Sequence, residues 1–117
     1  SFYGLSFDLP VLIRRSQYLG VPYPLINLDK YRTPHCDLYH RLSFNGLIKG
    51  HALDFYTTRF DLPVPADAVD GSDIGELVRH GQWDWVKAHC RLDVMKTYLL
   101  GRRLGFLQPV LDSEPVL

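Results

Sequence analysis

Acidic and imidazole side chains stand at two places in the chain where their types and spacing suit cation chemistry. Asp8 follows Phe7 at the start of an expected early helix. His89 and Asp93 are four residues apart on a long expected helix, so their side chains share one helical face. Asp93 lies in an apolar stripe of that helix, where a carboxylate needs a cation or a strong donor nearby. The chemistry would be binding of a divalent cation, with the His89 imidazole as a general base.

Each of these residues also has a simpler interpretation. Asp8 is equally typical of an acid in the first turn of a helix. Asp93 could be a surface acid of an imperfectly amphipathic helix, and a single helical histidine such as His89 is often structural. A zinc site is not indicated, because the histidines and cysteines lack paired ligand spacing.

The first half of the chain predicts one helix, a long connection and two short strands. Residues 2–5 are expected to end a buried strand, after which Ser6 caps a helix that Gly20 ends. Residues 20–34 contain three prolines and predict an exposed connection. Residues 35–38 are expected to form a short strand that leads into a helix carrying Leu38, Leu42 and Phe44, in which Asp37 acts as a cap.

The second half predicts three helices. They are expected at about residues 52–60, at a short stretch capped by Ser72 or Asp73, and at about residues 82–104. The expected organisation is one partial domain over residues 1–104, followed by an extended tail over residues 105–117. Trp83 and Trp85 are expected to be core residues. So many helices with so few strands are typical of the back half of an α/β domain.

Composition narrows the class of protein. The chain has 117 residues, about one domain, and its 13 basic and 13 acidic residues cancel. The net charge therefore creates no overall positive electrostatic field that could hold a polyanion. Contact with nucleic acid must depend on a local group of basic residues or on bound metal ions. No apolar run is long enough for a membrane span. Cys36 and Cys90 predict buried, reduced thiols, and with them a cytoplasmic location.

Four segments, in order, carry a resemblance to a known family. They are residues 2–12, 35–38, 70–72 and 89–99, the last of which contains His-Cys-Arg-Leu-Asp-Val and ends in Thr-Tyr-Leu. Together they resemble the DEDD-type 3′-5′ exonucleases of the ribonuclease-H-like fold, in the bacterial group related to the proofreading exonuclease domain of family B DNA polymerases. The resemblance implies an α/β fold of ribonuclease-H-like exonuclease type, with this chain as its helix-rich C-terminal half with few strands.

The resemblance also implies roles for individual residues. Asp8 and Asp93 would be the metal-binding aspartates of the second and third exonuclease motifs, and His89 stands where a tyrosine usually orients or activates the attacking water. Tyr3 and Phe7 are candidate substrate-binding residues, although Tyr3 is also typical of a core residue. The implied cofactor is Mg²⁺ or Mn²⁺, because hydrolysis of a phosphodiester uses two divalent cations held by carboxylates.

The chain departs from the family pattern at three places. No Asp-x-Glu motif precedes residue 2, Tyr3 replaces an asparagine, and His89 replaces the tyrosine. The sequence begins without an initiator methionine, and we expect a fragment. Metal binding is expected to be weak or absent in this chain alone, and activity impaired unless an Asp-x-Glu motif is supplied.

The sequence therefore predicts a metal-dependent 3′-5′ exonuclease-like domain that acts on single-stranded nucleic-acid ends. The alternative is a catalytically inactive relative that serves as a nucleic-acid-binding or protein-interaction module. We expect no membrane partner, and we expect self-association or pairing with a missing N-terminal segment, because a half-fold exposes apolar helix faces.

Overall fold

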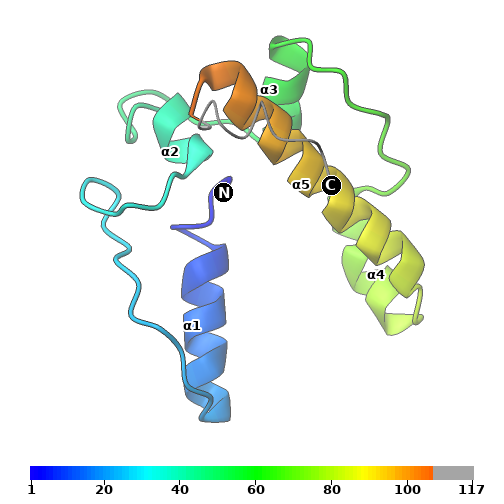
Figure 1. Cartoon of the computed structure of the whole chain (residues 1–117). Helices are drawn as coiled ribbons and strands as arrows, with labels where there is room; N and C mark the ends of the chain where they lie inside the picture. The colour runs from blue at the N-terminus through cyan, green and yellow to red at the C-terminus, as the bar shows by residue number, and fades with distance from the viewer. Residues whose placement is uncertain (107–117) are drawn as a thin grey trace, which may run out of the picture. The chain divides into compact units, whose positions relative to one another are not determined.

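The structure is a computed structural model that describes residues 1–106 of the chain. Its elements are α1 (Asp8–Leu19), α2 (Leu38–Leu42), α3 (Leu53–Arg59), the 3-10 turn η1 (Gly71–Asp73), α4 (Ile74–Arg79) and α5 (Trp83–Leu104) (Figure 1). They divide into two compact units, Ser1–Ala52 and Leu53–Leu117. Most of the tail expected at residues 105–117 lies outside the described residues, so its extended form stays a prediction.

The first unit contains α1, the early helix that the sequence predicts. Gly20 ends it in the left-handed conformation, with φ of 68°, and donates its N–H to the carbonyl of Gln17. The expected cap is wrong: the N-cap is Phe7, without a side-chain hydrogen bond. Ser6 lies one residue before the N-cap, and its hydroxyl is 3.0 Å from Nε2 of His40.

The two strands expected in this unit do not form. Residues 2–5 contain a turn, and residues 35–37 are irregular. The carboxylate of Asp37 accepts the N–H groups of Tyr3, at 2.7 Å, and Leu5, at 3.0 Å, so these donors are used without a neighbouring strand. No strand occurs anywhere in residues 1–106, and the α/β class is therefore not confirmed, although the helix-rich character is.

Asp37 also begins α2, as the sequence predicts. Its side chain accepts the N–H of Tyr39 at 3.0 Å, and Asp37 itself is only 2% exposed. The rings of Tyr3 and Tyr39 meet edge to face with centroids 4.4 Å apart, which joins the first residues of the chain to this helix. Phe44, expected inside the helix, lies beyond its end in the left-handed conformation, with φ of 51°.

The second unit is built around α5. Both α3 and α4 pack against this long helix, and Figure 1 shows α4 beside its first turns. The buried apolar side chains of this unit are Leu100, Tyr56 and Val69. Much of the rest of α5 faces solvent: Trp83 and Trp85 are about half exposed, so their expected place in the core is wrong. The unit therefore has a small core and a large apolar surface.

The sequence predicts buried cysteines and no membrane-spanning helix, and the structure bears on both. Cys36 and Cys90 are both free thiols. Cys36 is partly exposed and Cys90 is exposed, which contradicts the expected burial of both thiols. Among residues 1–106, no helix combines the length and the apolar character needed to cross a bilayer.

Candidate metal and catalytic site

Three potential metal ligands meet in the second unit. Nδ1 of His89 lies 2.7 Å from Oδ2 of Asp67, and Nε2 of the same ring lies 3.3 Å from Oδ2 of Asp93. One ligand atom from each of the three residues falls within 4.8 Å of the others. The His89 ring therefore stands between two carboxylates, an arrangement that could hold a cation or move a proton.

The long helix supplies two members of this cluster. Because His89 and Asp93 are four residues apart within α5, the helix places them one above the other, as the sequence predicts. The Asp93 side chain is 47% exposed, whereas that of His89 is 18% exposed. Thr97 donates its hydroxyl to the backbone carbonyl of Asp93 and leaves the carboxylate to the cluster.

The third member, Asp67, was missed by sequence reasoning. It lies in the loop between α3 and η1, 22 residues before His89, and no motif spacing links the two. Its Oδ1 accepts the N–H of Val69 at 3.0 Å, and Val69 is buried. The only available signal was its place beside the proline-rich loop and the Asp-Gly-Ser segment at 70–72.

Backbone donors keep the loop carboxylates ionised. The Val69 N–H lowers the pKa of Asp67; burial opposes this effect, and the hydrogen bond from His89 adds to it. The pKa of Asp70 is also lowered, chiefly by the backbone N–H of Ser72 and then by the Ser72 hydroxyl. Both side chains are therefore anionic acceptors at neutral pH.

A lysine supplies fixed positive charge to the same cluster. Lys96 is only 4% exposed, and its ammonium lies 2.7 Å from a carboxylate oxygen of Asp54 on α3. The same nitrogen is 3.9 Å from Asp67 and 4.0 Å from Asp93. Lys96 thus faces three carboxylates, and it balances part of the charge that would otherwise attract a cation.

Replacing Lys96 with methionine is expected to lower the free energy of unfolding by about 1–2 kcal/mol. The change removes the partner of three carboxylates, and the exposure of Asp54 and Asp93 keeps the cost below that of a fully buried pair. Urea denaturation would measure the loss. The control is Lys87→Met, which removes an exposed lysine from the same helix, and equal effects of the two changes would contradict the expectation.

The other candidate residues lie in the first unit. Asp8 is exposed and is the first residue of α1, which is where the sequence placed it. Its Oδ2 lies close to Gly4, since a Cβ atom built there would be 3.9 Å away. Phe7 is 59% exposed and Tyr3 is 41% exposed, so both side chains are available for contact.

The backbone at Tyr3 adopts a conformation that is unusual for tyrosine. Tyr3 has φ of 64°, a left-handed conformation that asparagine adopts more easily than tyrosine. The resemblance places asparagine at this position. The Tyr3 ring packs edge to face against Tyr39, which holds the tyrosine in this conformation.

The structure groups the candidate residues in two sets. Tyr3, Phe7 and Asp8 belong to the first unit, and His89 and Asp93 belong to the second. His89 and Asp93 lie together because they are four residues apart on α5. Because each unit is described by itself, the meeting of Asp8 with Asp93 stays a prediction.

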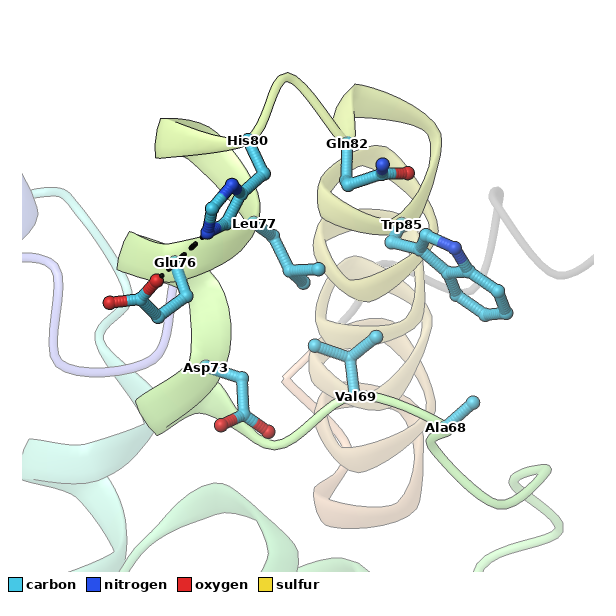
Figure 2. A pocket seen from close by; sticks show the side chains of 8 residues that line it. All are labelled: Ala68, Val69, Asp73, Glu76, Leu77, His80, Gln82 and Trp85. Carbon is cyan, nitrogen blue, oxygen red and sulfur yellow. Dashed lines mark ion pairs between the residues drawn. The ribbon is translucent and has the colours of Figure 1, made fainter.

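The second unit also has an open pocket (Figure 2). It is lined by Glu76 and Leu77 of α4, by Trp85 of α5 and by Val69 of the preceding loop. Glu76 pairs with His80 at 3.2 Å, as the dashed line shows. Val69 also donates to Asp67, so the pocket and the cluster share one loop.

Comparison with known proteins gives one positive result. A family model described as "Predicted 3'-5' exonuclease related to the exonuclease domain of PolB" matches residues 1–116. No curated protein and no solved structure matches the chain. The match extends over both units, and it agrees with the resemblance drawn from the four sequence segments.

Proposed function

The chain belongs to the family of predicted 3′-5′ exonucleases related to the exonuclease domain of PolB, and we propose that it takes part in metal-dependent hydrolysis of phosphodiester bonds at the 3′ ends of single-stranded nucleic acid. Asp8 and Asp93 are the proposed metal ligands and His89 the proposed base. The observation that supports this proposal is the Asp67–His89–Asp93 cluster, in which the imidazole of His89 lies 3.3 Å from the carboxylate of Asp93, the proposed aspartate of the third exonuclease motif.

The donors present suit a divalent cation of the expected type. Carboxylate oxygens are preferred by Mg²⁺ and Mn²⁺, and an imidazole nearby favours Mn²⁺ over Mg²⁺. Asp93 is half exposed, so its carboxylate can turn toward an ion without leaving a buried bond unmade. A divalent cation held by Asp93 and Asp8 would supply positive charge to the phosphate that is being attacked.

The protein's own groups have distinct tasks in this proposal. His89 takes a proton from the attacking water through Nε2, which faces Asp93 rather than Asp67. Phe7 and Tyr3 offer exposed aromatic rings on which the terminal bases can stack. Lys96 limits cation affinity, since its ammonium is 4.0 Å from Asp93 and repels a second positive charge.

The same lysine favours a second candidate function. If Lys96 neutralises the carboxylates well enough to keep the cation out, the chain is a catalytically inactive relative that binds nucleic acid or a protein partner. The exposed apolar side chains of α5, among them Trp83 and Val94, give such a module a surface for contact, including contact with a second copy.

The deciding experiment follows the shortening of a 5′-labelled single strand in the presence of Mn²⁺, which records the mononucleotides removed from its 3′ end. We expect slow stepwise shortening from the 3′ end, because no Asp-x-Glu motif completes the metal site. We expect Asp93→Asn to be slower again by about 10³-fold, since a lost ligand weakens charge stabilisation by several kcal/mol. Asp84→Asn removes an exposed acid from the first turn of the same helix and serves as the matched control.

The outcomes separate the two functions. Release that Asp93→Asn abolishes and Asp84→Asn retains supports the exonuclease. Equal release by all three proteins points to a contaminating nuclease and contradicts the proposal. Binding of the labelled strand without any shortening, measured by fluorescence anisotropy, favours the inactive module.

A further inference from the structure

The loop carboxylate of Asp67 is bonded on the side of the His89 ring away from Asp93. Oδ2 of Asp67 lies 2.7 Å from Nδ1, a distance typical of a charge-assisted hydrogen bond. Nε2 on the opposite side of the ring lies 3.3 Å from Asp93. Asp67 contacts only the nitrogen that the proposed chemistry does not use.

Asp67 is itself held in place from two further directions. Its Oδ1 accepts the backbone N–H of Val69 at 3.0 Å, and Val69 is 8% exposed. The ammonium of Lys96 lies 3.9 Å from Oδ2. One oxygen is thus committed to the backbone and the other to His89, so the carboxylate has little freedom to turn.

The chemistry of the acceptor fixes the proton on the ring. An ionised carboxylate only accepts hydrogen bonds, and the lowered pKa of Asp67, due first to the Val69 N–H, keeps it ionised. Nδ1 must then carry the hydrogen. Asp93 faces Nε2 at 3.3 Å and is half exposed, whereas Asp67 is 2.7 Å from Nδ1. The neutral ring has one hydrogen, which the shorter bond to Asp67 keeps on Nδ1, so Nε2 retains its lone pair.

We infer that Asp67 is a positioning residue that holds His89 in the Nδ1–H tautomer and in the ring orientation that presents Nε2 beside Asp93. This inference rests on the proposed function for its catalytic meaning, because the tautomer matters only if His89 accepts a proton. The placement itself is a property of the described residues, and it can be tested without any substrate.

The first test reads the tautomer of His89 by ¹⁵N NMR of the full chain with labelled histidine, at a pH where the ring is neutral. His89→Gln identifies the resonance. We expect hydrogen on Nδ1 in the unchanged protein. A ring with its hydrogen on Nε2 would overturn the inference, and this measurement needs no substitution of Asp67.

The second test replaces Asp67 with asparagine. The oxygen of the new amide keeps the hydrogen bond from the Val69 N–H, so the amide NH₂ faces Nδ1 of His89 and donates a hydrogen bond to it. We expect the hydrogen of the ring to move to Nε2, and kcat for mononucleotide release to fall on the order of 10³-fold with KM little changed, as for the wrong tautomer in a serine-protease triad.

Asp70→Asn is the matched control, since Asp70 is a neighbouring loop acid that bonds to Ser72 and not to the ring. It should leave both the tautomer and kcat unchanged. An unchanged tautomer in Asp67→Asn would overturn the inference. If the tautomers are as expected but no protein shortens the strand, the positioning role of Asp67 is supported and the proposed function is overturned. If the unchanged protein is active with the hydrogen of His89 on Nε2, the proposed function is supported and the positioning role is overturned.

Discussion

The double variant Asp8→Asn/Asp93→Asn is expected to release mononucleotides no more slowly than either single variant, each of which loses about 10³-fold. Two ligands of one cation act as a unit, so the second loss adds little once the first has removed the ion. This result would establish that the first residue of α1 and the middle of α5 serve one site, although they belong to different units.

The measurement needs a control for effects on folding. Asp8 is also an acid in the first turn of α1, and its loss costs about 0.3–1 kcal/mol of helix stability. Circular dichroism would show that each variant is folded. Asp8→Asn/Asp84→Asn should behave like Asp8→Asn alone. Losses that multiply in the Asp8/Asp93 pair would mean that the two aspartates act independently, and the single-site proposal would fail.

The second large effect is expected at Asp37. Replacing it with alanine should destabilise the first unit by about 2–4 kcal/mol, because three backbone N–H groups lose their acceptor. They belong to Tyr3, Leu5 and Tyr39, and the donor-to-acceptor distances are 2.7–3.0 Å. The carboxylate is almost fully buried, so water cannot replace it without opening the structure.

Amide hydrogen exchange is the appropriate measurement, since the two units can unfold separately and a single global transition would mix them. Exchange at Leu5 and Tyr39 should accelerate by 30-fold or more, about 2 kcal/mol, while amides within α5 stay unchanged. Asp29→Ala is the control: the side chain of Asp29 accepts one N–H, from Tyr31, at an exposed position. Similar acceleration in both variants would contradict the special role of Asp37.

Helix positions in this chain could be predicted because their signals are local. Gly20 lies just after α1 and Gly105 just after α5, and both adopt the left-handed conformation that ends a helix. The apolar spacing and the His89–Asp93 pair of α5 likewise depend only on residues within four positions of each other. Asp37 was placed correctly as a cap for the same reason.

What the sequence could not predict depends on partners far along the chain. Asp67 reaches His89 across 22 residues, and Lys96 reaches Asp54 across 42, so no periodicity reveals either pair. The strands expected at residues 2–5 and 35–38 failed because a strand requires a neighbour. Here the donors of Tyr3 and Leu5 are taken by a single side chain.

The position of Lys96 also has a consequence for chemical labelling. Acylating reagents need access to the lysine amine, and the amine of Lys96 is enclosed by Asp54, Asp67 and Asp93, whereas Lys87 on the same helix is open to solvent. Acylation of Lys87 and acylation of Lys96 therefore measure two different properties. Lys87 records only that reagent was present, and Lys96 becomes reactive when the carboxylates around it separate.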